Sequence, residues 1–460
     1  MLFSSPIFLF LFLPVVLAFC ALPGLKLRNG LLLIFSVIFY AWGEVLFVFL
    51  MLGSALLNHF LGLWVDRETE PARRKWAVGV AVVLNIGTLA FFKYANFAVG
   101  NLNALLGLFH AGPMHMNPVR LPIGISFFVF HNISLLVDLT GKRKETPDLK
   151  SVFLYIIFFP QLVSGPITRA EMFMPQIQPK YLEDIPFVEA AKWILTGFFF
   201  KLYVANNLNE MTSYMEFPLY ETLQTQDRWL LVFLYSYQIY ADFFGYSAIA
   251  IGLALLFGYR LPINFNLPYI SASFSEFWTR WHMSLSSWLR TYLYVPLGGN
   301  RHGALRTYLN LLIVMGLGGL WHGAGLGYLL WGLLHGVLLV IERPFLARLA
   351  TIDSAAFRAA RMGFVFVCVT MLWIFFKLPN FDHAVSYLSG MFTPSTNPNP
   401  PKLFYDLALL YSLPVLIQHL VSRSRFEQTL GGAEPYLYGL MAALMYLEAG
   451  PETSFIYFQF

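Results

Sequence analysis

Residues Phe277 to His335 read FWTRWHMSLSSWLRTYLYVPLGGNRHGALRTYLNLLIVMGLGGLWHGAGLGYLLWGLLH. The first part of this stretch places Trp, Arg and His side by side, and its second part is an apolar run that ends in Leu320-Trp321-His322-Gly323. Polar side chains at membrane depth are rare because their transfer into hydrocarbon is unfavourable, and those that occur have a partner or a function. His322 is therefore the first candidate functional residue.

The composition of the whole chain is typical of an integral membrane protein. Of the 460 residues, 58% are hydrophobic and 12% are charged, whereas soluble domains carry about 25% charged residues. Only helices and closed barrels satisfy every backbone hydrogen bond in lipid, and the apolar runs are much longer than barrel strands. The sequence predicts an all-α polytopic membrane protein with about eleven spans plus re-entrant or interfacial helices.

Charge and cysteine content argue against several other classes of protein. The formal net charge of +5 is modest, and the basic residues lie in short runs between apolar segments, a pattern that fits membrane topology rather than nucleic-acid binding. Cys20 and Cys368 both lie within apolar runs, so neither a disulfide framework nor a cysteine-based metal site is expected. Residues 1–450 are expected to form one transmembrane domain, followed by a tail at 451–460.

Basic turns between the apolar runs predict the orientation of the chain in the membrane. Lys and Arg accumulate on the cytoplasmic side of membrane proteins. The clusters assigned to that side lie at residues 26–28, 67–75, 142–150, 343–361 and 423–425. Alternation of the spans then places the N-terminus and the C-terminal tail outside. The charged, aromatic region 259–306 is interrupted by three prolines and is expected to form a cytoplasm-facing funnel.

His322 lies in a glycine-rich setting, with Gly318 and Gly319 before it and Gly323 directly after it. Glycines let two backbones, or a slender ligand, approach closely. Imidazole titrates near neutral pH, so His322 is a candidate general base that takes a proton from an acceptor hydroxyl. A packing histidine that donates to a neighbouring carbonyl fits the same pattern and stays open. His335 needs no role beyond packing.

A second candidate group surrounds His282, which follows Arg280 and Trp281 in the same stretch. One interpretation is that His282 lines the path of an anionic ligand, with Arg280, Arg290 and Arg301 attracting phosphates. The alternative is an interfacial belt, where Trp and Arg anchor a helix at the lipid headgroups. On spacing alone, the belt is favoured.

Two further features require burial or a partner. Asp242 is a carboxylate inside an apolar run; it either orients a catalytic histidine or pairs with an arginine, and pairing is favoured. The last six residues, FIYFQF from Phe455 to Phe460, are unusually apolar for a terminus, since termini are commonly polar and frayed. This tail either docks against the bundle or the outer leaflet, or enters a central channel and presents the Tyr457 phenol to His322.

Seven motifs along the chain together resemble the membrane-bound O-acyltransferase (MBOAT) family, in the branch of the alginate O-acetylation membrane subunits. They are FFKYANF at 91–97, LPIGISF at 121–127, FPQLVSGP at 159–166, the run 242–252, FWTRWHMSL at 277–285, LGGNR at 297–301 and GGLWHGA at 318–324. The resemblance covers nearly the whole length. It implies a ring of tilted helices around a central tunnel that joins a cytoplasmic funnel to the outside.

The resemblance also implies an activity. In this family an acyl thioester, here acetyl-CoA, enters from the cytoplasm, and the membrane histidine matched by His322 supports transfer without a metal. An extracytoplasmic partner that resembles SGNH hydrolases then passes the acyl group to a polysaccharide hydroxyl, as in alginate biosynthesis, at the bacterial inner membrane. The tail resembles the C-terminal motif of this branch, whose tyrosine, here Tyr457, is proposed as an acyl relay. The expected funnel residues are His282, Arg280, Trp281, Asn300 and Arg301.

Two departures from the family pattern accompany the resemblance. Relatives usually carry Asp where this chain has Thr291, and often where it has Ala248, so a carboxylate role at these positions is lost or moved. Two alternative functions stay open. One is direct O-acylation of peptidoglycan or of a lipid-linked glycan without the tail relay, and the other is a transporter or channel for an acyl carrier.

Overall fold

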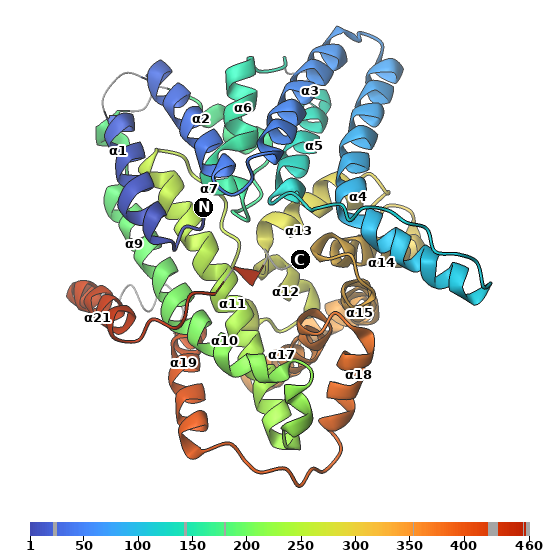
Figure 1. Ribbon diagram of the computed structural model, residues 1–460, viewed down its shortest axis with the longest axis vertical. Coiled ribbons are helices and arrows are strands. Elements are labelled where there is room, and N and C mark those ends of the chain that lie inside the picture. Colours follow the sequence, from blue (N-terminus) through green and yellow to red (C-terminus); the bar gives the residue numbers. More distant parts are fainter. Residues whose placement is uncertain are drawn as a thin grey trace. The chain divides into compact units, whose positions relative to one another are not determined.

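The regular structure of this protein is helical. The computed structural model describes residues 1–21, 25–141, 145–178, 181–352, 354–421, 431–453 and 455–456. Helices follow one another along these residues, and no strand occurs among them (Figure 1). The expected all-α class is therefore confirmed.

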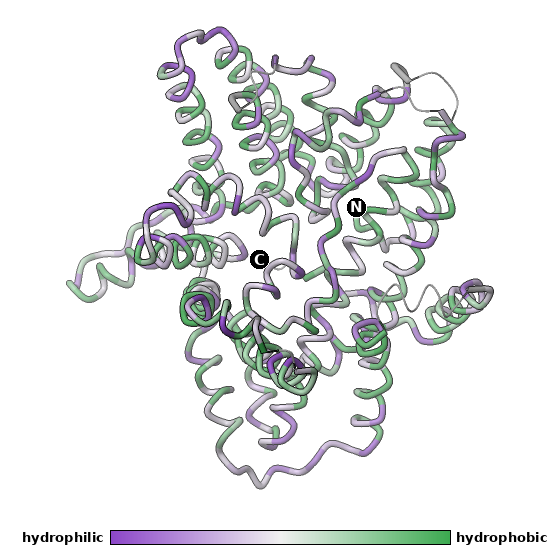
Figure 2. The backbone as a smooth tube through the Cα atoms, turned by 180° about the vertical axis from the view of Figure 1, so that it is seen from behind, coloured by the Kyte–Doolittle hydropathy of each residue, from purple (hydrophilic) through white to green (hydrophobic). Residues whose placement is uncertain are grey.

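Within the described residues, seven helices are long and apolar enough to cross a membrane. They are α3 (Phe47–Arg67), α4 (Pro71–Leu108), α11 (Thr225–Leu256), α14 (Gly303–His322), the continuous helical run Leu326–Leu349 that begins with α15 (Leu326–Glu342), α17 (Ala355–Lys377) and α19 (Lys402–Leu420). Shorter apolar helices lie in α1 (Leu13–Ala21), α2 (Leu25–Ala41) and α5 (Ile125–Gly141). Figure 2 shows the apolar stretches along these helices and the hydrophilic turn between α3 and α4. The expected number of about eleven membrane spans stays a prediction.

Some apolar runs of the sequence are broken into short helices. The run at 151–166 forms α6 (Leu149–Ile157) and α7 (Phe159–Leu162), with Pro160 near the start of α7. A proline disfavours helical conformation in the residue before it and lacks the amide that would continue the helix. The run at 186–206 forms α9 (Phe187–Phe198) and continues in the π-helix η4 (Phe199–Ala205).

The chain divides into two compact units. The first contains Met1–Ala191 and Ala250–Pro262, and the second contains Lys192–Ile249 and Ile263–Phe460. In the first unit, α3 and α4 are joined by a reciprocal amide pair: Asn58 donates to Asn85 over 3.1 Å and accepts from it over 2.7 Å. Both side chains are buried, so each satisfies the polar group that the other brings into the bundle.

The second unit contains the histidines that the sequence singles out. Its further helices are α10 (Asn206–Thr212), α12 (Phe274–Arg280), α13 (Met283–Leu289), the π-helix η8 (Arg290–Tyr294), α18 (Phe381–Gly390) and α21 (Glu434–Leu447). The segment 391–401 links α18 to α19 (Figure 1). Consecutive helices α14 and α15 pack against each other along their length, and this pair builds the candidate site.

Candidate active site

Glycines on α14 and α15 allow the two helix backbones to touch. A Cβ added to Gly319 would lie 3.1 Å from the Cα of Gly332, and a Cβ added to Gly332 would lie 3.0 Å from the Cα of Gly319. On the other side of α15, a Cβ on Gly327 would lie 2.8 Å from the carbonyl oxygen of Pro379. Side chains at these positions would separate the helices. Small residues therefore fix the end of α14, where His322 lies.

His322 is the last residue of α14, and aromatic rings surround it. Its ring centroid lies 5.0 Å from Trp321, 5.2 Å from Trp331 and 5.3 Å from Phe376. The side chain is 3% exposed. The interplanar angles of 71° to 89° are edge-to-face arrangements, which aromatic quadrupoles favour. We call His322 and these three rings the aromatic box.

The second candidate histidine, His282, adjoins the aromatic box. Its ring centroid lies 6.4 Å from that of His322, and its edge-to-face neighbour Phe243 lies at 4.6 Å. His282 precedes α13 with a left-handed backbone, φ 42° and ψ 54°, a conformation that is uncommon outside glycine. Complete burial lowers the pKa of His282 to about 3, so its ring is neutral at neutral pH.

Asn264 organises the polar contacts next to His282 and was missed by the sequence analysis. Its Oδ1 accepts from the Ser284 hydroxyl over 2.5 Å and lies 3.4 Å from His282 Nδ1. Its Nδ2 donates to the Ser247 hydroxyl over 2.9 Å, and its backbone carbonyl oxygen accepts from the Met283 amide over 2.9 Å. The sequence signal is an amide, followed two residues later by Asn266, within an apolar, proline-interrupted run, and it does not indicate the partners of Asn264.

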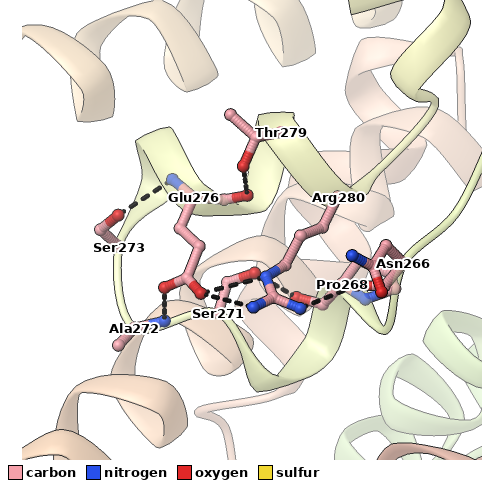
Figure 3. A network of polar contacts seen from close by, with 8 residues as sticks. All are labelled: Asn266, Pro268, Ser271, Ala272, Ser273, Glu276, Thr279 and Arg280. Carbon is pink, nitrogen blue, oxygen red and sulfur yellow. Dashed lines mark hydrogen bonds and ion pairs between the residues drawn. The ribbon is translucent and has the colours of Figure 1, made fainter. Parts of the chain in front are cut away.

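Arg280 and Trp281 are held within the protein rather than presented to a ligand. Figure 3 shows the Arg280 guanidinium donating to Glu276 Oε1 and to the carbonyl oxygen of Asn266, both at 3.0 Å. Trp281 is 1% exposed and its ring lies 4.9 Å from Trp373. In this structure both residues stabilise α12 and its connection to α13.

Asn300 and Arg301 lie on an exposed turn between η8 and α14. Gly298 (φ 104°) and Gly299 (φ 58°) have positive φ angles that favour glycine. The Asn310 side chain donates to the carbonyl oxygen of Gly299 over 2.9 Å, and Arg301 Nε donates to that of Gly298 over 3.2 Å. A side chain of α14 thus stabilises the turn, while Asn300 and Arg301 remain exposed.

The described end of the tail, Phe455 and Ile456, is buried in the second unit. Asp242 pairs with Lys201 over 2.6 Å and accepts from the backbone amide of Ile456 over 2.8 Å. Phe455 stacks on Tyr246 with ring centroids 4.2 Å apart. The expected pairing of Asp242 is found, but its partner is a lysine rather than an arginine, because α9 and η4 bring Lys201 beside α11. Tyr457 lies outside the described residues.

A cavity with a volume of about 60 Å³ adjoins the tail, enough for a few water molecules. Asp242 and Ile456 contribute to one part of its lining, and Phe376, a ring of the aromatic box, contributes to another. Its lining consists of Ala205, Asn209, Glu216, Tyr235, Gln238, Asp242, Phe376, Lys377, Thr453 and Ile456. Within the part of the chain that the structure describes, no group of His, Cys, Asp and Glu is suited to hold a metal ion.

The structure thus brings the rings of His322 and His282 together. The described end of the tail lines a cavity that is also lined by Phe376, whose ring contacts His322. A model of the membrane-bound O-acyltransferase family matches residues 34–381. This chain belongs to that family. The MBOAT protein is therefore an acyltransferase, and the family resemblance of its motifs is confirmed.

Curated relatives match this MBOAT protein over most of its length. It is 42% identical over 397 residues to the probable alginate O-acetylase AlgI of Pseudomonas putida, which covers 85% of this chain and 80% of the relative. It is 33% identical over 427 residues to the peptidoglycan O-acetyltransferase of Helicobacter pylori, again with 85% and 80% coverage. A teichoic acid D-alanyltransferase of Bacillus subtilis matches 46% of this chain at 31% identity and is covered over 58% of its own length.

Proposed function

We propose that this MBOAT protein moves acetyl groups from cytoplasmic acetyl-CoA across a bacterial inner membrane for the O-acetylation of an extracytoplasmic, alginate-like polysaccharide. The names of the relatives support the acetyl group and the polymer acceptor, since several of them are called probable alginate O-acetylases. The orientation proposed from the basic turns has the N-terminus and the tail outside. The acceptor side of the reaction then lies where the tail ends.

The observation that supports this proposal most strongly is the cavity beside the tail. It is lined both by Ile456, which directly precedes Tyr457 in the sequence, and by Phe376, whose ring contacts His322 at a centroid distance of 5.3 Å. The cavity is therefore bordered by the described end of the tail and by a ring that packs against the proposed base. We assign Tyr457 as the acyl acceptor, His322 as its base, and neutral His282 as a second catalytic group that supports His322.

The first proposed step is transfer from a thioester to a phenol. His322 removes the proton of the Tyr457 hydroxyl as the phenol oxygen attacks the acetyl carbonyl. The bond to sulfur breaks as the new ester bond forms, and the proton on His322 passes to the departing coenzyme A thiolate. The aromatic box excludes bulk water, which would otherwise hydrolyse the thioester or the ester.

The second proposed step moves the acetyl group to a hydroxyl outside the membrane. Tyrosine has a pKa near 10, so its phenolate is a better leaving group than a sugar alkoxide, and an aryl ester can still acylate an alcohol. The proposed acceptor is a hydroxyl of an SGNH-hydrolase-like partner, which passes the acetyl group on to the polysaccharide. The Tyr457 phenol regains its proton and is ready for the next cycle.

On the donor side, we propose that exposed Asn300 and Arg301 bind the phosphates of acetyl-CoA. A guanidinium is suited to phosphate through its planar set of donors. Arg280 and Trp281, which are held by Glu276 and by the aromatic core, contribute to this side by fixing the wall of the funnel. Removal of the Arg301 charge is expected to raise the KM for acetyl-CoA rather than to lower kcat.

The test is the intact mass of the purified protein after incubation with acetyl-CoA, followed by peptide mapping. An acetyl group on Tyr457 in the wild type, absent in His322→Ala and in Tyr457→Phe, is the expected result. Thioester cleavage that depends on His322 without any adduct, even after rapid quenching, would contradict the relay. An intact thioester in detergent, with uptake into sealed vesicles, would instead support a transporter.

A second candidate acceptor is peptidoglycan, acylated without the tail relay. The observation that favours it is the 33% identity to the peptidoglycan O-acetyltransferase of H. pylori over 85% of this chain. The two functions differ in the effect of Tyr457→Phe in cells. Loss of polymer acetylation is expected for the relay, whereas unchanged acetylation of peptidoglycan would favour direct transfer.

A further inference from the structure

The C-terminal tail follows a defined path along η4 and α10. The Gly450 amide donates to the carbonyl oxygen of Leu202 over 3.1 Å, and the Asn207 side chain donates to that of Glu448 over 3.0 Å. A Cβ added to Gly450 would lie 2.7 Å from the Asn207 backbone nitrogen, so the residues that lead into the tail are in direct backbone contact with α10. The main chain is therefore anchored immediately before the tail begins.

Further along the tail, two buried charges hold main-chain atoms. Lys201 Nζ lies 3.2 Å from both the carbonyl oxygen and the hydroxyl of Thr453. Asp242 Oδ2 accepts from the Ile456 amide over 2.8 Å, while Asp242 Oδ1 pairs with Lys201. One ion pair thus binds a carbonyl and an amide of the same short segment, and these contacts do not depend on the side chain of Ile456.

Two glycines explain how Lys201 and Asp242 meet. A Cβ on Gly197 would lie 2.7 Å from the carbonyl oxygen of Gly245, and a Cβ on Gly245 would lie 2.9 Å from the Lys201 backbone nitrogen. The two helices are therefore in backbone contact just where the ion pair forms. Lys201 lies in the π-helix η4, and such irregular turns occur preferentially at functional sites.

The Lys201–Asp242 ion pair is buried, so its stability depends on the docked tail. The side chains of Lys201 and Asp242 are only 4% and 6% exposed. Buried ions require further hydrogen bonds in addition to their mutual attraction, because both have lost their hydration. The tail supplies such hydrogen bonds to both ions. An undocked tail would leave part of this requirement unmet, so docking and the ion pair stabilise each other.

We propose that Lys201 and Asp242 form a clamp that binds the main chain of the tail and positions its end for acyl transfer. The proposal rests on the proposed function, since the clamped residue Ile456 directly precedes the proposed acceptor Tyr457. Lys201 and Asp242 are positioning residues: they act through the tail and take no part in bond making. Their removal should expose the tail and lower kcat without changing the KM for acetyl-CoA.

The first experiment measures tail docking without any acyl donor. The probe is Ile456→Cys in a Cys20→Ala/Cys368→Ala background, labelled with a maleimide in detergent and followed by intact mass. This substitution keeps the backbone amide that Asp242 binds. Adding Lys201→Met/Asp242→Leu should accelerate labelling about tenfold or more, because hydrogen bonds to charged groups contribute that much to docking. Unchanged labelling would overturn the clamp.

The control for this variant is another lysine-carboxylate pair of the same unit. Lys192 and Glu434 also lie 2.6 Å apart, but their side chains are 40% and 39% exposed. Lys192→Met/Glu434→Gln should leave labelling of the probe at the wild-type rate. Acceleration of the same size in this control would show a general loosening of the unit and overturn the clamp.

The second experiment measures acetyl-CoA turnover in the same clamp variant without the cysteine probe. The expected result is a kcat reduced about tenfold with an unchanged KM for acetyl-CoA. Faster labelling with an unchanged kcat would overturn the positioning role while leaving the clamp itself intact. Labelling needs no acyl donor, so the clamp is judged independently of whether Tyr457 becomes acetylated.

A tail-only variant keeps the proposal testable if the double substitution does not fold. Ile456→Pro removes the amide that donates to Asp242 and leaves every residue of the bundle unchanged. Its kcat should fall about tenfold, whereas Ile456→Val, which retains the amide, should match the wild type. Equal activity of the proline and valine variants would overturn the positioning role.

Discussion

The aromatic box around His322 and the clamp around Asp242 hold buried polar groups in opposite ways. The box surrounds an imidazole with neutral rings, namely Trp321, Trp331 and Phe376. The clamp pairs a carboxylate with an ammonium and adds hydrogen bonds from the main chain of the tail. The two regions meet at one cavity, which Phe376 and Asp242 both line.

The difference follows from what each region has to do. A general base must change its protonation state during the reaction, so a fixed charge in direct contact would favour one of its two states. A binding contact for a main chain benefits from fixed charges, because charge-assisted hydrogen bonds are stronger than neutral ones. The molecule thus uses neutral packing for the proposed chemistry and charges for the proposed positioning.

The largest effect on acetyl-CoA turnover is expected from substitution of His322 in the aromatic box. His322→Gln should reduce acetyl-CoA turnover about 10³-fold, because general base catalysis contributes about 10²- to 10⁴-fold. The measurement is release of coenzyme A by the purified protein, with a thermal unfolding curve as the check on folding. His335→Gln is the matched control in the next helix. A His322→Gln protein that retains a tenth of wild-type turnover would exclude His322 as the base.

The next effect concerns the charge balance of the clamp. Asp242→Ala should lower the free energy of unfolding by about 3 to 5 kcal/mol, because it leaves the Lys201 ammonium buried without its counter-ion. Lys201→Met/Asp242→Leu should be far less destabilising, since both charges are removed together. Unfolding in detergent micelles measures both values. Equal destabilisation by the single and the double variants would show that side-chain volume, not charge, dominates this region.

A smaller effect is expected from the glycine contact that supports the box. Gly319→Ala should lower the free energy of unfolding by about 2 kcal/mol, because its Cβ would push against the backbone of α15. Gly363→Ala in α17 is the control, since its Cβ would meet nothing within 4 Å. That control should be neutral or stabilising by up to about 1 kcal/mol. Similar stability of the two variants would argue against backbone contact between α14 and α15.

The smallest effect is the pH dependence that arises from His282. Its pKa of about 3 in the folded protein lies below the ordinary value near 6.5. Its contribution to stability is therefore complete above about pH 6.5 and is lost as the pH falls toward 3. From about pH 7 to about pH 5.5, the wild type should lose about 1 kcal/mol more than His282→Asn. Parallel unfolding curves for the two proteins would contradict a buried neutral His282.

His282→Asn is the suitable substitution for this comparison. Asparagine tolerates the left-handed backbone that His282 adopts, and it keeps a neutral polar side chain near Asn264. His282→Ala removes that polarity as well, and its turnover should fall below that of His282→Asn. Thermal unfolding across the pH range and coenzyme A release on the same samples separate the two effects.

The class of the protein and its family follow from the amino-acid sequence alone. Apolar content and run length predict a helical membrane protein, because lipid leaves helices and barrels as the only ways to satisfy the backbone. The motifs around residues 91–97, 159–166 and 318–324 predict the family, and the family model confirms it. An acidic residue inside an apolar run requires a partner, so the pairing of Asp242 was predictable as well.

Which residues meet becomes visible in the three-dimensional packing and not before. Lys201 rather than an arginine pairs with Asp242, Asn264 adjoins His282, and Trp281 lies in the aromatic core. These contacts join segments whose separation in sequence exceeds any helical period. They depend on where glycines let two backbones touch, as at Gly197 and Gly245. Periodicity shows which face of a helix is apolar, whereas crossing angle and register, which are set by packing, select the partner.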